Sequence, residues 1–214
     1  RRVLFRSVSF GIDVILGEEI DREVDRRVMM FLPDVFRMEA DGAYIVRNDG
    51  GRSEFIANRD TVLEDVNAPD KTYFFLSPLF LFSLLLLCAV LLFIQELRRK
   101  KYTAWLDVVM HTFQGGAGLL VAFLFFLSEH PAVDSNWLVV MFNPIPLFYA
   151  AWLLYCYKKG RKNLLSYVNL AVTAGFMITM VLCLQSFNPA MWVLMSSFLV
   201  RALSQAHFTY HKGR

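Results

Sequence analysis

An uncharged, strongly apolar stretch spans residues 72–95, and it constrains the fold of this chain more than any other feature. A lipid bilayer requires roughly 20 consecutive apolar residues in helical form, because only a helix satisfies its own backbone hydrogen bonds there. This stretch therefore predicts a first membrane span. Together with the other apolar stretches, it predicts five spans, at about residues 73–95, 104–128, 136–157, 164–184 and 190–208.

Proline and polar residues interrupt two of the apolar stretches. Asn143, Pro144 and Pro146 lie within the third span, and we expect the backbone carbonyl groups freed there to bond to protein or to a polar cavity. The uncharged region 163–200 is too long for one crossing, and the polar cluster at 185–189 supplies a turn that divides it.

Lysine and arginine residues are distributed among the short loops in a pattern that predicts the orientation of the spans. Ten of them follow the first, third and fifth spans, whereas the loops at 128–136 and 185–189 contain none. The ten are Arg98, Arg99, Lys100, Lys101, Lys158, Lys159, Arg161, Lys162, Lys212 and Arg214. The positive-inside rule predicts a cytoplasmic C-terminus and places residues 1–71 in a periplasm or its equivalent. Tyr102 and Trp105 fall near predicted interfaces, where aromatic residues anchor helices.

Residues 1–71 differ in composition and predict a small α+β extracytoplasmic segment. They carry 11 basic and 15 acidic residues, a net charge of −4, whereas residues 72–214 carry 11 basic and only 4 acidic residues. Pro33 predicts a short helix that reaches about Ala40, and the segments 44–46 and 54–56 flank an Asn-Asp-Gly-Gly turn typical of a hairpin. These elements bury little core, so we interpret the segment as the C-terminal remnant of a periplasmic domain in a longer protein.

The expected fold class is therefore mostly α: a five-helix polytopic membrane bundle (72–214) preceded by a small α+β extracytoplasmic segment (1–71). The net charge of +3 does not indicate a nucleic-acid partner, and membrane lipid is the expected one. Cys88, Cys156 and Cys183 all fall in apolar stretches, so we expect buried, inert thiols. No cysteine–histidine spacing typical of zinc is present, and we predict neither a metal nor a cofactor.

Two groups of residues resemble a known family. The first is the run LGEEIDREVDRRVMMFLPD at 16–34. The second comprises Gly115, Gly116, Gly118, the run FLFFLSEHP at 123–131, Asn136-Trp137 and Asn143-Pro144. Both resemble the Lnb family of bacterial lipoprotein N-acyltransferases.

The resemblance implies a domain of the bacterial inner membrane that anchors an upstream periplasmic catalytic domain and presents diacylated, lipid-embedded lipoproteins to it. The family's catalytic Cys and His lie in that upstream portion, and this chain has no extracytoplasmic cysteine. We therefore expect the full-length protein to be an acyltransferase, no catalytic residue among residues 1–214, and no activity from this chain alone.

The outward loop after the second span carries the candidate functional or docking residues. These are Glu129, His130, Asn136, Asn143 and Pro144. A Glu-His pair suits acid–base chemistry because histidine titrates near neutral pH. The alternative is a polar loop that caps helices and leaves the histidine solvated. We favour a structural role or docking against the upstream domain.

Four intramembrane polar residues form a second candidate group: Asp107, His111, Gln114 and Arg201. Charged groups at membrane depth cost about 2.5–3.5 kcal/mol on insertion scales, so each requires a partner or a role. We predict that Arg201 pairs with the Asp107/His111 face, in a structural role. The alternative places Asp107 at the interface, with Arg201 extending its charged head to the membrane surface.

Small residues mark two further helix faces, and two other functions stay open. Gly115, Gly116 and Gly118 on the second span, and Ala171 and Gly175 on the fourth, predict close helix approach.

A transporter- or channel-like module would also contain a proline-broken helix and buried charges. An inert membrane anchor of an unrelated exported domain is the third possibility.

Overall fold

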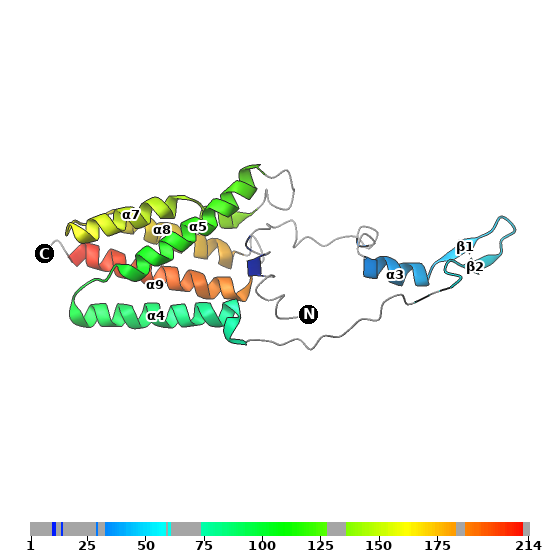
Figure 1. Cartoon of the computed structure of the whole chain (residues 1–214), viewed down its shortest axis with the longest axis horizontal. Helices are drawn as coiled ribbons and strands as arrows, with labels where there is room; N and C mark the ends of the chain where they lie inside the picture. The colour runs from blue at the N-terminus through cyan, green and yellow to red at the C-terminus, as the bar shows by residue number, and fades with distance from the viewer. Residues whose placement is uncertain are drawn as a thin grey trace. The chain divides into compact units, whose positions relative to one another are not determined.

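The computed structural model describes residues 10–11, 14, 29, 33–58, 60, 74–127, 136–182 and 187–211. The chain divides into two compact units (Figure 1). One comprises Arg22–Pro69, and the other comprises Arg1–Asp21 together with Asp70–Arg214. The candidate residues Glu129 and His130 lie outside the described residues.

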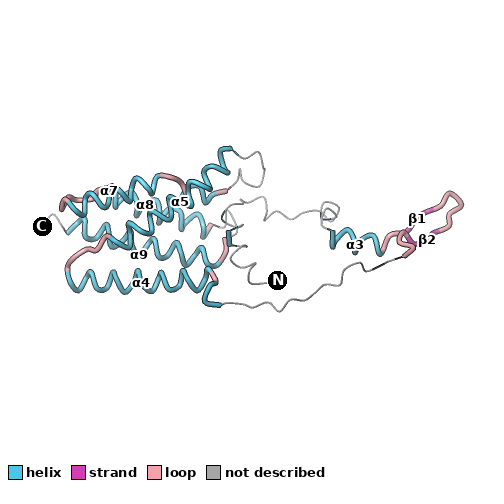
Figure 2. Tube along the Cα trace, in the orientation of Figure 1, coloured by secondary structure: helices cyan, strands magenta, loops and turns pink. Residues whose placement is uncertain are grey.

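The larger unit is a helical bundle, and the mostly α prediction is confirmed. Its helices run side by side along one direction (Figures 1 and 2). They are α4 (Pro78–Arg99), α5 (Trp105–Leu127), α7 (Ile145–Lys158), α8 (Leu165–Val181) and α9 (Pro189–His211), with short 3-10 turns η2 (Phe74–Leu76) and η3 (Trp137–Val140).

Among the described residues of this unit, three segments are long and apolar enough to cross a membrane. They are Pro78–Arg99, Trp105–Leu127 and Trp137–Lys158, and the apolar helix α8 is shorter. Large apolar side chains on these helices are exposed, among them Leu84, Phe113 and Phe148. Exposed apolar surface on spanning helices is the surface that faces lipid, so the chain is a membrane protein.

Helix α4 begins and ends later than the predicted span of 73–95. Pro78 occupies its first turn, and Ser77 caps it by accepting a hydrogen bond from the Phe80 amide at 3.3 Å. The helix continues past Glu96 to Arg99. Lys100 then ends it with a left-handed backbone conformation (φ 51°), which is typical of helix C-termini. This extension brings Glu96 into the bundle, where it is buried.

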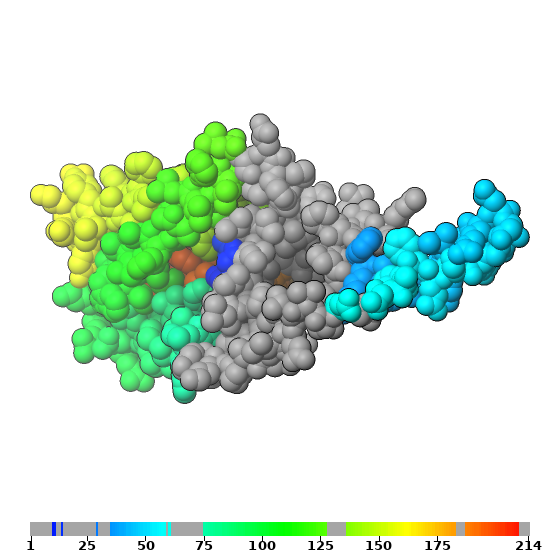
Figure 3. All heavy atoms as spheres, turned by 45° about the vertical axis from the view of Figure 1, so that its right-hand side comes forward, coloured from blue at the N-terminus to red at the C-terminus, as the bar shows by residue number. Residues whose placement is uncertain are grey.

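Most side chains of helix α9 are buried or half-buried in the bundle. Both α4 and α8 pack against it, while α5 packs against α7. Its Met191, Met195 and Phe198 are buried in one apolar core with Phe176 and Met180 of α8. In the space-filling view, an orange patch of α9 is visible between α5 and α4 (Figure 3). Arg201 itself is 1% exposed.

Two glycines of α5 permit a close approach, as predicted. A Cβ added at Gly118 would lie 2.3 Å from the backbone oxygen of Asn143, and one at Gly115 would lie 2.7 Å from the backbone nitrogen of Leu147. The prediction is wrong for Gly116 and Gly175, where an added Cβ would meet nothing within 4 Å. These two glycines point away from any neighbouring helix.

The buried-thiol expectation holds for one of the two described cysteines. Cys156 on α7 is buried, but Cys88 on α4 is exposed on the apolar outer surface of the bundle. Cys88 lies in α4, a helix whose apolar side chains largely face lipid. An apolar sequence around a cysteine there therefore does not predict burial against protein. Cys183 lies outside the described residues.

The described residues of the smaller unit include the predicted short helix and hairpin. The helix α3 covers Pro33–Asp41, and the strands β1 (Tyr44–Val46) and β2 (Arg52–Glu54) pair antiparallel, with Tyr44 opposite Glu54. The second strand begins earlier than predicted because the turn closes quickly, with Gly50 at a positive φ of 82° and the Gly51 amide bonded to Asp49 Oδ1.

Candidate functional site at a buried polar cluster

Charge inside the bundle is concentrated at one point. Of the 11 basic residues in 72–214, ten lie in the segments that follow the first, third and fifth predicted spans, and Arg201 is the exception. Its side chain is 1% exposed and pairs with the carboxylates of Glu96 and Asp107, which are fully buried. Residues from α4, α5 and α9 therefore meet in one ion cluster, defined here as Glu96, Asp107 and Arg201.

The Arg201 guanidinium donates five hydrogen bonds. Nε and Nη2 each bond to one Asp107 carboxylate oxygen at 2.7 Å. Nη1 and Nη2 bond to the two Glu96 oxygens at 2.9 and 3.0 Å. Nη2 also donates to the Thr103 carbonyl at 3.3 Å. Both carboxylates are bound in the bidentate geometry that the planar guanidinium favours.

Neighbouring donors complete the hydrogen bonding of the two carboxylates. Ser204 Oγ donates to Glu96 Oε2 at 2.6 Å, and the Thr103 amide donates to Oε1 at 2.8 Å. The Tyr102 hydroxyl donates to Asp107 Oδ2. Burial raises the pKa of Tyr102 well above its ordinary value, and the Asp107 charge raises it further, so the phenol stays protonated as a donor.

The predicted pairing of Arg201 with Asp107 is confirmed. His111, the other member of the predicted face, bonds to glutamines instead: Nδ1 lies 2.8 Å from Gln114 Oε1, and Nε2 lies 3.5 Å from Gln205 Nε2. Sequence reasoning missed Glu96, because the first span was ended one residue before it. The signal was available, since Glu96 is one of only four acidic residues in 72–214.

A chain of hydrogen bonds extends from the α7–α8 loop into the middle of the bundle. Asn163 Nδ2 donates to the Tyr149 hydroxyl at 3.1 Å, and Tyr149 donates to Gln205 Oε1 at 2.5 Å. Gln205 Nε2 faces His111 Nε2, and Nδ1 of His111 faces Gln114. If Nδ1 of a neutral His111 carries the proton, it donates to Gln114 Oε1, and Nε2 accepts from Gln205 Nε2. Every donor in this series of hydrogen bonds then faces an acceptor.

The chain ends at the break between η3 and α7. Gln114 Nε2 donates to the Met141 carbonyl at 2.8 Å, and Asn143 Nδ2 donates to the carbonyls of Val139 and Val140 at 3.2 and 2.9 Å. The expectation that freed carbonyls bond to protein is therefore confirmed at these three positions. No water is available in the bilayer core, so these side chains satisfy carbonyl groups that would otherwise have no hydrogen-bond donor.

The outer-loop candidates that the structure describes have capping contacts. Asn136 caps η3 through Oδ1, which accepts from the Leu138 amide at 3.0 Å, and its Nδ2 donates to the Val14 carbonyl at 2.8 Å. Asn143 Oδ1 accepts from the Ile145 amide at 3.0 Å, and Pro144 stands at the N-cap of α7. A docking role for these residues stays a prediction.

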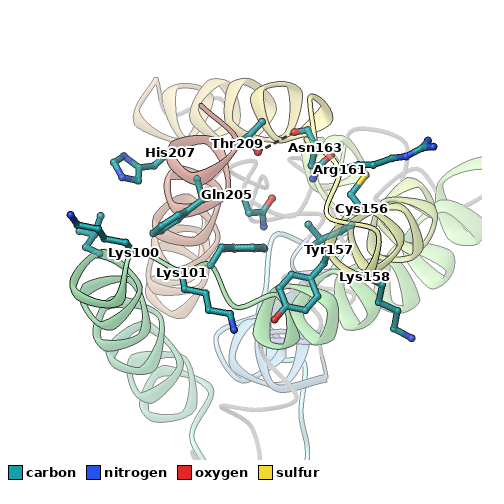
Figure 4. A pocket seen from close by; sticks show the side chains of 14 residues that line it. Lys100, Lys101, Cys156, Tyr157, Lys158, Arg161, Asn163, Gln205, His207 and Thr209 are labelled. Carbon is teal, nitrogen blue, oxygen red and sulfur yellow. Dashed lines mark hydrogen bonds between the residues drawn. The ribbon is translucent and has the colours of Figure 1, made fainter. Parts of the chain in front are cut away.

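A cavity of about 1000 Å³ opens at the end of the bundle where α4 and α7 end. Asn163 and Gln205, the beginning of the hydrogen-bonded chain, line it together with Thr209. Figure 4 shows Gln205 near the centre of the ring of helices, with Lys100, Lys101 and Lys158 around the rim. The ion cluster lies beside this cavity, since Tyr102 both lines the cavity and bonds to Asp107.

Residues 70–213 match the family model described as the Lnb transmembrane domain. The chain belongs to this family. The matched region contains every described element of the helical bundle from η2 to α9, including the ion cluster. No curated protein and no solved structure matches the chain.

In this Lnb transmembrane domain, the polar side chains are suited to holding helices together. Each oxygen of Glu96 and Asp107 already accepts a hydrogen bond from Arg201 and its neighbours. Among the described residues, no three His, Cys, Asp or Glu side chains gather closely enough to hold a metal ion. The ion cluster therefore fixes α4 and α5 against α9 at one depth of the bundle.

Proposed function

We propose that this chain is the membrane domain of a lipoprotein N-acyltransferase, in which it anchors an upstream periplasmic catalytic domain and presents lipid-embedded lipoproteins to it. The observation that carries the proposal is the match of residues 70–213 to the Lnb transmembrane domain. The diacylated lipoproteins and the upstream domain are then its partners, and the bacterial inner membrane is its location.

The internal bonding of the bundle supports an anchoring role. A buried arginine with two carboxylate partners is costly to separate, so the three helices that carry these residues move as one body. A rigid membrane body can hold a soluble domain at a fixed height above the bilayer, where lipid-attached substrates lie.

The distribution of charge supports the proposed orientation. Lys100, Lys101, Lys158 and Arg161 line one cavity at a single end of the bundle. Loops rich in lysine and arginine are retained on the cytoplasmic side of membranes, so we assign this end, and the C-terminus, to the cytoplasm. The opposite end, where Asn136 contacts Val14, then faces the periplasm and is the proposed docking surface for the catalytic domain.

The transporter-like alternative has one observation in its favour, the hydrogen-bonded chain through His111 and Gln205. Transport through this region would require the ion cluster to open to water. All four carboxylate oxygens of Glu96 and Asp107 accept hydrogen bonds from buried protein groups, which opposes such opening. We therefore favour the anchoring and presenting function.

A domain replacement separates anchoring from presentation. The full reading frame, including any segment upstream of Arg1, is expressed in a bacterium that lacks its own lipoprotein N-acyltransferase. In a matched variant, an unrelated single membrane span replaces residues 70–213. Mass spectrometry of lipoprotein N-termini measures acylation. We expect both proteins in the membrane fraction, with acylation lost in the replaced one. Full acylation with the foreign span would contradict presentation, and the absence of an upstream Cys/His thiol site would contradict the acyltransferase assignment.

A further inference from the structure

A segment near the N-terminus of the chain is attached to the end of the bundle where α4 begins. Residues Arg1–Asp21 belong to the same compact unit as the bundle, whereas Arg22–Pro69 form the second unit. Phe10 and Val14 are half-buried and pack against the apolar core of the bundle. The Phe10 ring meets the ring of Phe82, near the beginning of α4, edge to face at a centroid distance of 5.2 Å. The described residues of this segment, coloured blue, lie against the bundle in both views (Figures 1 and 3).

A buried asparagine adds a polar contact to the same segment. Asn136 is 2% exposed, and it stands 122 residues away from Val14 in the sequence. Its Oδ1 accepts a hydrogen bond from the Leu138 amide at 3.0 Å and caps η3, while its Nδ2 donates to the Val14 carbonyl at 2.8 Å. A buried amide side chain requires partners for both its oxygen and its nitrogen. One side chain therefore fixes the start of η3 and holds Val14 beside it.

These contacts change how the unit Arg22–Pro69 is connected to the bundle. The chain enters this unit after the attached residues Phe10 and Val14, and it leaves the unit toward η2 and α4, which belong to the bundle. The unit is therefore joined on both sides to segments that the bundle holds. A segment attached at both ends samples fewer conformations than one attached at a single end, because each closure removes chain entropy.

We propose that Phe10 and Val14, held by Phe82 and Asn136, form a latch that restrains the movement of the extracytoplasmic part of the protein relative to the bundle. Asn136 is then a positioning residue. Any domain upstream of Arg1 is joined to the chain through the latched segment, so the latch fixes its point of attachment. The latch itself requires only the contacts described above, whereas its effect on acylation rests on the proposed function.

The chain offers variants that separate the latch from the capping of helices. Asn136→Asp keeps the oxygen that caps η3 but removes the Nδ2 donor to Val14. Asn143→Asp is its matched control, since it also keeps a capping oxygen and loses a donor to backbone carbonyls, but those carbonyls lie outside the latch. Phe10→Ala removes the ring contact without changing Asn136, and Phe113→Ala, at an exposed position on α5, is the control for it.

Hydrogen exchange tests the latch in the purified protein, expressed from the full reading frame with any segment upstream of Arg1. We expect amide exchange in the peptide that contains Phe10 and Val14 to accelerate about 10-fold in Asn136→Asp and in Phe10→Ala, because each variant removes a contact that opposes local opening. The two controls should change exchange in this peptide by less than about 3-fold. Exchange around Arg201 should stay as in the wild type, which shows that the bundle remains folded.

Lipoprotein acylation tests whether the latch positions the reaction. The same reading frame is expressed in the bacterium that lacks its own lipoprotein N-acyltransferase. Phe10→Ala should lower acylation on the order of 10-fold, because misplacement by a small distance is costly to a group transfer. Phe113→Ala should leave acylation unchanged.

Three results overturn the proposal. Wild-type exchange in both latch variants would show that Asn136 and Phe82 do not hold the segment. Equal acceleration in the latch variants and their controls would show that the segment responds to any change in the bundle. Faster exchange together with wild-type acylation would show that the segment is held but does not position the reaction. If the wild-type protein itself fails to acylate lipoproteins, the proposed function is contradicted, and the exchange measurement still decides whether the latch exists.

Discussion

The Arg201 guanidinium holds both carboxylate oxygens of Asp107 at 2.7 Å, and through this contact α9 is joined to α5 inside the bundle. The same guanidinium holds Glu96 of α4. A lone charge at membrane depth costs about 2.5–3.5 kcal/mol on insertion scales, so each of these groups depends on the others to remain there. The ion cluster is therefore a structural requirement of the bundle.

Replacing Arg201 with lysine should destabilise the bundle although the charge is kept. A lysine ammonium is a single point donor and cannot bind two carboxylates in bidentate geometry. We expect a loss of about 2–4 kcal/mol, between the cost of one charged hydrogen bond and that of a broken buried pair. Denaturant unfolding of the purified chain in micelles measures this free energy. Wild-type stability in Arg201→Lys would show that the guanidinium geometry is unimportant.

Removing the Tyr102 hydroxyl should weaken the ion cluster in a pH-dependent way. Tyr102→Phe removes one of the two donors to Asp107 Oδ2 and leaves only Arg201 Nη2, and we expect a loss of about 1–3 kcal/mol at neutral pH. The folded protein raises the pKa of Tyr102 above its ordinary value of 10.0, so the folded state binds this proton more tightly than the unfolded state. Its stabilising contribution is complete below pH 10 and decreases as the pH rises beyond that value.

Melting curves of wild type and Tyr102→Phe between pH 7 and alkaline pH test this expectation, with the exposed Tyr167→Phe as the control. The difference between wild type and Tyr102→Phe should stay constant up to about pH 10 and then shrink. A difference that grows with pH would contradict the assigned donor role.

Two glycines on opposite faces of α5 should respond to alanine with opposite sign. In Gly118→Ala the new methyl group would meet the backbone of Asn143, and we expect a loss of about 1–3 kcal/mol from overpacking. Gly116 has open space, so Gly116→Ala should stabilise the helix by up to about 1 kcal/mol. Denaturant unfolding of both variants measures the contrast, and equal effects would contradict the close packing of α5 on the α7 break.

Periodicity and charge in the sequence predict the helices and one of the two ion pairs. The break at Asn143-Pro144 follows from proline chemistry, and the Arg201–Asp107 pair follows from the cost of charge in lipid. These inferences need only local sequence and a bilayer. Both inferences agree with the structure, because a helix in a bilayer has few ways to accommodate a proline or a buried charge.

The remaining contacts depend on which residues face each other across helices, which periodicity does not determine. Glu96 stands beside four basic residues and resembles part of an interfacial flank, yet α4 extends far enough to bury it. Tyr102 fits an interfacial anchor by position, but the loop after α4 turns it toward Asp107. Gln205 of α9 and Tyr149 of α7 meet through their side chains, although α9 packs most closely against α4 and α8.

The central claim, that the ion cluster holds α4, α5 and α9 together, is tested most directly by removing its charges singly and together. Arg201→Met leaves two carboxylates without their cation, and we predict a loss of about 3–5 kcal/mol. The triple variant Glu96→Gln/Asp107→Asn/Arg201→Met removes every charge, and it should recover most of that loss in denaturant unfolding of the purified chain. A single variant as stable as wild type, or a triple variant no more stable than the single one, would contradict the account.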